Sequence, residues 1–296
     1  MIETLLSIDI GIAPTIIDKW GIEITWHGLF TALGVVIGVL VAAYFGRKAG
    51  YKEDHIYNAA LALVIGGIIG ARLLYVAENW SQFEDDLSGI IEVNTGGISI
   101  YGALIGGLVG GWLYCIIAKV PNIPKAADIA AIGGIIGMAV GRIGDIINGE
   151  HFAKTTDLWW GVIYTDPNSP SFIRFGVAAE PQHPAVAYEL LGDLVIFAIL
   201  IFLYTHVRRS GVTFFAWVFL YGALRTAVSF LRLDDTIWGT GLRTAQVIGI
   251  VAMVIGLIGI VYLLMVPPRE ETGESRAARR RALREEAPTV EEEPAT

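Results

Sequence analysis

The stretch AQVIGIVAMVIGLIGIVYLLMV, residues 245–266, decides the fold because it carries no charged side chain. A hydrocarbon core about 30 Å thick is crossed by roughly 20 helical residues at about 1.5 Å rise, and this run therefore predicts a transmembrane helix. Six further runs lie upstream, near residues 26–45, 57–77, 98–118, 127–147, 185–205 and 212–231. Because they are continuously apolar rather than alternating, we expect an all-α polytopic membrane protein, a seven-transmembrane-helix bundle and not a β-barrel.

The composition supports a membrane protein and excludes several other classes. Of the 296 residues, 54% are hydrophobic, which is more than a soluble domain of this length needs. The net charge of −8 argues against a nucleic acid partner. Cys115 is the only cysteine and lies in an apolar run, so we expect no disulfide within the chain and no metal or other cofactor.

Basic residues in alternate connections set the expected orientation, because such residues are retained on the cytoplasmic side. One set of connections holds Arg47, Lys48, Lys52, Lys119, Lys125, Arg208, Arg209 and the cluster at 276–284. The other set is acidic or long, at residues 78–92, 149–183 and 234–235. We therefore expect the N-terminus outside and the C-terminus in the cytoplasm, with the chain multi-pass in the inner (plasma) membrane.

Three parts of the chain are expected. Residues 1–23 contain too many charges to span and are predicted to form an amphipathic segment on the outer surface. Residues 24–267 form the membrane domain, with an outer head region at about 149–183. Residues 268–296 are rich in Arg, Glu, Ala and Pro and are expected to form a charged, disordered cytoplasmic tail.

Glycines spaced by four predict close helix packing, because small residues on one face let two backbones approach. Examples are Gly102, Gly106 and Gly110 in one run and Gly133, Gly137 and Gly141 in the next.

Arg72, Arg142 and Arg225 require an explanation because they interrupt apolar runs, each at a cost of about 2.5–3.5 kcal/mol on insertion scales. In the expected topology all three lie toward the outer ends of their helices and can converge at one depth. Guanidinium groups bind phosphate oxygens with a planar fork, and a phospholipid headgroup is the phosphate found at that depth. The alternatives are snorkelling to the interface and pairing with Asp145 or Glu150.

Further polar groups gather near these arginines. The run from 142 to 150 places Arg142, Asp145, Asn148 and Glu150 at the end of one helix. A second stripe follows helical spacing in the sixth run and consists of Tyr221, Arg225, Ser229 and Arg232. At the start of the fifth run His183 and Pro184 precede Tyr188 and Glu189. His183 is read as a helix cap or a site residue, and Glu189 requires an arginine or hydroxyl partner.

From Ile24 to Val266 the chain resembles the bacterial phosphatidylglycerol:prolipoprotein diacylglyceryl transferase family. The matching pieces are Trp26-His27-Gly28-Leu29, Gly70-Ala71-Arg72-Leu73, Gly96-Gly97-Ile98-Ser99-Ile100-Tyr101-Gly102, the run from Gly141 to Glu150, His183-Pro184 with Tyr188-Glu189, and Tyr221-Gly222-Ala223-Leu224-Arg225. The resemblance implies transfer of a diacylglyceryl group from phosphatidylglycerol to the lipobox cysteine thiol of prolipoprotein signal peptides, with release of glycerol phosphate. It implies no cofactor.

The resemblance also implies roles for individual residues. Arg142 and Arg225 match the family's essential arginines, Asn148 and Glu150 its signature polar residues, Tyr221 a site tyrosine and Arg72 a recurrent arginine.

The resemblance is to a divergent member of the family, and the first of its departures concerns the proton acceptor. Tyr101 stands where the family usually has a histidine, and His27 where it usually has a tyrosine. Asp145 replaces an asparagine, Ala153 a glycine and Ser229 a glutamate. Two interpretations stay open: His27 takes over part of the missing role, with Tyr101 and His27 both catalytic, or the chain is a lipid-binding homologue with another acceptor or no transferase activity. A small-solute transporter is a third hypothesis, which the missing internal repeat disfavours.

Overall fold

The computed structural model describes residues 7–20, 22–84, 87–91, 97, 99–177, 180–233 and 241–266. Within them, six helices are long and apolar enough to cross a membrane: α1 (Trp26–Lys48), α2 (Glu53–Glu78), α4 (Ile123–Asn148), α6 (Ala185–His206), α7 (Val212–Ser229) and α8 (Thr244–Met265). The apolar helix α3 (Ile100–Ile117) is shorter in its described part. The chain is therefore a mostly helical, multi-pass membrane protein, and each of the apolar runs found in the sequence forms one of these helices.

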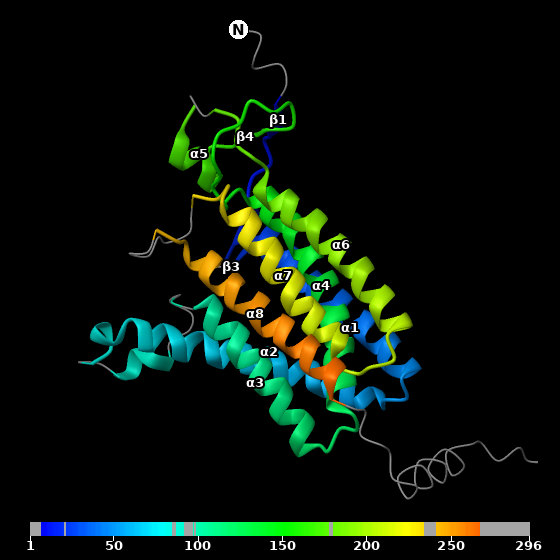
Figure 1. Cartoon of the computed structure of the whole chain (residues 1–296). Coiled ribbons are helices and arrows are strands. Elements are labelled where there is room, and N and C mark those ends of the chain that lie inside the picture. The colour runs from blue at the N-terminus through cyan, green and yellow to red at the C-terminus, as the bar shows by residue number, and fades with distance from the viewer. Residues whose placement is uncertain are drawn as a thin grey trace, which may run out of the picture.

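Short strands and helices extend the fold at one end of the bundle, where Figure 1 shows β1, β4 and α5 together. Strand β1 (Ile8–Ile10) pairs in parallel with β4 (Val162–Tyr164), so the N-terminal segment and the predicted head region form one unit. Strands β2 (Thr15–Lys19) and β3 (Ile22–Thr25) form an antiparallel hairpin before α1. The remaining short elements are η2 (Trp80–Gln82), η3 (Leu87–Ile91) and α5 (Pro170–Phe175). The sequence did not predict these strands. The tail expected at 268–296 and the acidic pair at 234–235 lie outside the described residues.

Glycines bring the long helices together in two close pairs, α1 with α4 and α2 with α3. A Cβ atom added at Gly34 would lie 2.4 Å from the carbonyl oxygen of Gly137, and one at Gly106 would lie 2.3 Å from that of Gly66. These separations are shorter than any real Cβ contact, so backbone meets backbone along both pairs, as the spacing by four predicts. In Figure 1 the pair α2 and α3 lies to one side of the other long helices.

Helix α4 is the centre of the bundle and packs on α1, α6 and α7. Its Ile132 and Ile135 are fully buried together with Leu200 of α6. Asp128 on the same helix accepts hydrogen bonds from the backbone N–H groups of Gly211 and Phe214, both at 2.8 Å, and so caps the first turn of α7. Because α4 is fixed on several sides, residues at its end are held rigidly.

Candidate active site

Glu189 on α6 gathers three arginines around one carboxylate. Its side chain is 2% exposed and lies 2.5 Å from Arg225 Nη1, 3.0 Å from Arg142 Nη2 and 3.2 Å from Arg232 Nη1. The arginines come from the end of α7, from α4 and from the turn after α7. Of the three arginines predicted to converge, the structure therefore brings together Arg142 and Arg225, and it adds Arg232. Tyr221 joins them, because Arg142 Nη2 lies 3.5 Å from its hydroxyl.

Asp145 connects this cationic cluster to a histidine. One turn after Arg142 on α4, it places Oδ2 3.1 Å from Arg142 Nη1 and Oδ1 2.5 Å from His27 Nδ1. His27 lies in the first turn of α1, which is N-capped by the Thr25 hydroxyl accepting from the backbone N–H of Gly28. The Asp145 side chain is 8% exposed, whereas that of His27 is 46% exposed.

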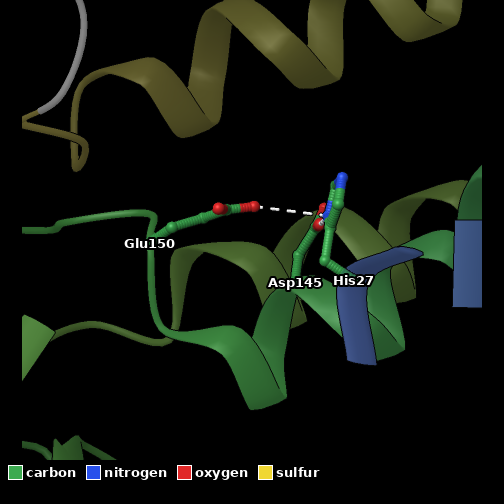
Figure 2. Close-up of side chains that lie close together, drawn as sticks. All are labelled: His27, Asp145 and Glu150. Atoms are coloured by element: carbon green, nitrogen blue, oxygen red, sulfur yellow. Dashed lines mark hydrogen bonds and ion pairs between the residues drawn. The ribbon is translucent and has the colours of Figure 1, made fainter. Parts of the chain in front are cut away.

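The chain after α4 folds back toward the same histidine. Gly149 ends the helix with φ of 70°, a left-handed conformation that glycine adopts without strain, and this turn returns Glu150 and His151 toward α1. Glu150 Oε1 lies 3.3 Å from His27 Nδ1, and Asn148 donates to Glu150 Oε2 at 3.0 Å. Figure 2 shows Asp145 and Glu150 on the same side of the His27 ring. The side-chain amide oxygen of Asn148, Oδ1, is buried without a hydrogen-bond partner among the described residues.

A long apolar cavity opens beside this cluster. It has a volume of about 820 Å³ and lies between the α1/α4 pair and the α2/α3 pair. His27, Arg142 and Asp145 line one end, and Tyr51 and Cys115 line the other. Its wall follows α1 from His27 to Gly46, a length of about 28 Å at the helical rise of about 1.5 Å per residue. The cavity therefore has one charged end and runs along nearly the whole height of a membrane span.

Arg72 does not join the cluster. Its guanidinium group donates to the carbonyl oxygens of Ile90 at 2.8 Å, Gly97 at 2.7 Å and Gly89 at 2.6 Å. These donations tie the connection between α2 and α3 to α2 and satisfy a buried cation with backbone oxygens. A role for Arg72 in lipid binding stays a prediction.

Tyr101 and Ser229 are two further positions at which the chain departs from the family. Tyr101 begins α3 and is not among the described residues that line the cavity. Ser229 is fully buried, and its hydroxyl donates at 2.7 Å to the carbonyl oxygen of Thr226 in its own helix. Participation of Tyr101 and Ser229 in the site stays a prediction. Ala153 is buried beside Ala185 and Val228 in a small apolar cluster.

The residues around the start of α6 connect the head to the bundle. His183 Nδ1 lies 3.4 Å from the hydroxyl of Tyr188, which accepts a hydrogen bond from Trp160 Nε1 at 2.7 Å. In the head, the Tyr164 hydroxyl donates to the carbonyl oxygen of Ile146 at 2.8 Å, and burial raises its pKa above the usual value. The residue that precedes α6 is Pro184, and no side chain caps this helix. The interpretation of His183 as a helix cap is therefore wrong, and its ring contacts Tyr188 instead.

Two residues of the cluster were missed in the sequence. His151 accepts a hydrogen bond at Nδ1 from Arg232 Nη2 at 2.8 Å, and its Nε2 lies 3.6 Å from Asp145 Oδ2. Asp193, one turn after Glu189, is fully buried and has no hydrogen-bond partner for either oxygen among the described residues. The available signals were a histidine directly after the polar run at 142–150 and a second carboxylate inside an apolar helix.

A metal ion is a further possible occupant of the charged end. Atoms of His27, Asp145 and Glu150 lie within 4.8 Å of one another, a spacing that suits a common ligand set. However, the hydrogen bond to His27 and the ion pair to Arg142 already account for both oxygens of Asp145. A guanidinium group 3.1 Å from Asp145 also opposes the binding of a second cation.

Fold and site together define a polytopic membrane protein with an arginine cluster at the charged end of a lipid-length apolar cavity. Comparison with known proteins gives the family. The model of the prolipoprotein diacylglyceryl transferase family matches residues 14–262, and the chain belongs to this family.

Similar proteins carry the name phosphatidylglycerol--prolipoprotein diacylglyceryl transferase. The one from Clostridioides difficile is 34% identical over 244 residues, which is 82% of this chain and 92% of the relative. The one from a Nostoc species is 32% identical over 278 residues, covering 88% of this chain and 95% of the relative. The one from Dehalococcoides mccartyi is 30% identical over 257 residues, covering 86% and 95%.

Proposed function

We propose that the protein transfers the diacylglyceryl group of phosphatidylglycerol to the lipobox cysteine thiol in prolipoprotein signal peptides, releasing glycerol phosphate. The observation that carries the proposal is that Arg142 belongs to both halves of the site. Its side chain lines the apolar cavity and also contacts Glu189, which holds Arg225 and Arg232. A lipid whose acyl chains fill the cavity therefore presents its phosphate to a group of fixed cations.

The geometry suits the chemistry. The thiolate sulfur attacks the glycerol carbon that bears the phosphate ester, the new carbon–sulfur bond forms, and the carbon–oxygen bond breaks with its electron pair passing to the phosphate. Negative charge therefore builds up on the leaving group. Arg142 and Arg225 are held by Glu189 and do not need to reorient when this charge appears, which is the condition for strong electrostatic stabilisation.

The other polar groups complete the substrate site. The buried side-chain oxygen of Asn148, Oδ1, has no hydrogen-bond donor among the described residues and is proposed to accept from a hydroxyl or amide of a substrate. Glu150, Tyr188 and Tyr221 hold their neighbours in place through the contacts described above. His183 is placed by Tyr188 at the border between head and bundle.

The same proposal places the site near the outer leaflet of the inner membrane. His27 begins α1, whereas Arg47 and Lys48 end it, so the site and the basic connection lie at opposite ends of the helix. Basic connections face the cytoplasm. With α3 counted as a seventh span, the N-terminus and the head lie outside, the site faces secreted precursors, and the tail at 268–296 lies in the cytoplasm.

The test is lipidation of a lipobox peptide by purified protein in vesicles that contain phosphatidylglycerol, followed by mass spectrometry of the thioether-linked product. Arg142→Ala and Arg225→Ala are each expected to lower turnover by about 10²–10³-fold, the effect of losing one group that stabilises developing charge. Arg47→Ala is the matched control, because Arg47 is half exposed and pairs with Glu53 at the other end of α1. No product with the parent protein would overturn the function, and full turnover by either alanine variant would overturn the assigned roles.

A further inference from the structure

The reaction requires a group that takes the proton of the acceptor thiol, and the residues around the cavity offer several candidates. We infer that His27 is this general base and that Asp145 is the positioning residue that orients it, an inference that rests on the proposed function. A free thiol has a pKa near 8.5 and is mostly protonated at neutral pH, so a base placed beside it accelerates attack.

The contacts of His27 fix which ring nitrogen is available. A carboxylate accepts hydrogen bonds and does not donate them, and Asp145 is held as a carboxylate beside Arg142. The 2.5 Å contact with Asp145 therefore requires a proton on His27 Nδ1, and Glu150 approaches the same nitrogen at 3.3 Å. In the neutral ring Nε2 then carries the lone pair. Among the described residues Nε2 has no hydrogen-bond partner, and Figure 2 shows this side of the ring directed away from both carboxylates.

The position of His27 suits proton transfer from a substrate. Its side chain is 46% exposed and lines the charged end of the cavity, next to Arg142 and Asp145. A thiol that approaches a lipid held by its phosphate at Arg142 therefore meets His27 at the same end. The proton moves from sulfur to Nε2, the sulfur lone pair forms the bond to carbon, and the imidazolium is stabilised by Asp145 until the proton leaves to the phosphate product or to water.

Other basic side chains of the cluster fit this role less well. His151 accepts from Arg232 at Nδ1, so its proton lies on Nε2, which faces Asp145 at 3.6 Å and Glu150 at 3.9 Å. A histidine held in this tautomer has no lone pair left for a thiol. The carboxylates of Asp145 and Glu189 form ion pairs with arginine side chains and are therefore poorer proton acceptors. The groups that face His27 are therefore Asp145 from α4 and Glu150 and His151 from the chain that follows.

The test compares two acceptor peptides that differ in one atom. A selenol is a stronger acid than a thiol and is already ionised near neutral pH, so a selenocysteine peptide needs no base. His27→Gln is expected to lower turnover of the cysteine peptide by about 10²–10⁴-fold while leaving turnover of the selenocysteine peptide within about tenfold of the parent protein. Turnover of the selenocysteine peptide also shows that the variant folds and binds lipid. His206→Gln is the matched control, because His206 is exposed at the far end of α6.

Asp145→Asn tests the positioning role. It is expected to show the same selective loss for the cysteine peptide, and the double variant is expected to be no slower than His27→Gln alone, because two residues that act as one unit are not additive. Equal losses for both peptides in His27→Gln, or full turnover of the cysteine peptide, would overturn the inference. Loss of parent activity on chelation, restored by a divalent metal, would also overturn it by making His27 a ligand. If the parent lipidates neither peptide, the proposed function fails instead.

Discussion

Replacing Glu189 with glutamine is expected to destabilise the fold by about 3–5 kcal/mol, the cost of removing one partner from a buried ion pair. Glu189 is 2% exposed and holds three guanidinium groups at 2.5, 3.0 and 3.2 Å. The amide keeps the shape of the side chain but removes the charge that offsets these cations. For a chain of this size about 1 kcal/mol corresponds to roughly 2–4 °C, so the unfolding midpoint should fall by about 6–20 °C.

Bound lipid should reduce this loss, because the phosphate of phosphatidylglycerol brings back a negative charge near the same arginines. The assay follows intrinsic tryptophan fluorescence during heating in a nonionic detergent, with added phosphatidylglycerol or with added phosphatidylcholine. The difference between parent and variant is expected to be smaller with phosphatidylglycerol, because only this lipid carries a net negative charge. Glu78→Gln makes the same chemical change at an exposed position and is the control. Equal midpoints for the two variants, or a loss that does not depend on the lipid, would refute the reasoning.

Two further predictions concern helix packing and the cavity. Gly106→Ala places a Cβ 2.3 Å from the carbonyl oxygen of Gly66 and should destabilise the protein by about 1–3 kcal/mol, whereas Gly134→Ala meets no atom within 4 Å and should leave the unfolding midpoint unchanged. Cys115→Trp narrows the cavity at the end far from His27 and should slow turnover of long-chain phosphatidylglycerol by about tenfold or more while sparing short-chain lipid. A lower unfolding midpoint for Gly134→Ala than for Gly106→Ala would contradict the first expectation. Equal losses of turnover for long-chain and short-chain lipid in Cys115→Trp would contradict the second.

The helices and the arginine cluster follow from the sequence because they rest on strong physical constraints. In a membrane the backbone N–H and C=O groups of an apolar run must bond to each other, which a helix achieves within the run itself. Residues 185–205 therefore predict α6 to within one residue. A charge inside such a run must find a partner there, which is why Arg142, Arg225 and Glu189 could be expected to meet. Arg142 lies near the end of α4, Glu189 near the start of α6 and Arg225 near the end of α7, so an up-and-down order of helices places them at the same end of the bundle.

The remaining parts could not be predicted, because backbone groups and turns leave little trace in residue type. Arg72 looks like Arg142 in the sequence, yet its partners are carbonyl oxygens of the connection after α2. His151 reaches Arg232 only because Gly149 reverses the chain at the end of α4. The strand pair β1 and β4 joins segments about 150 residues apart, and short strands without a long alternating pattern give no signal for such a pairing.

Asp145 raises the question whether a carboxylate next to Arg142 weakens the attraction for phosphate. The carboxylates fix the orientation of the arginine side chains and leave some of the N–H donors available for phosphate. A guanidinium group has five N–H donors, and Arg142 contacts three side chains, Asp145, Glu189 and Tyr221. Donors therefore remain for phosphate while the group is held in one orientation. Asp145 also gives its second oxygen to His27, so the aspartate that lowers the net positive charge is the residue that orients the proposed base. Fixed orientation contributes more to lowering the barrier than an additional mobile charge, because groups already in place need not reorganise when charge develops.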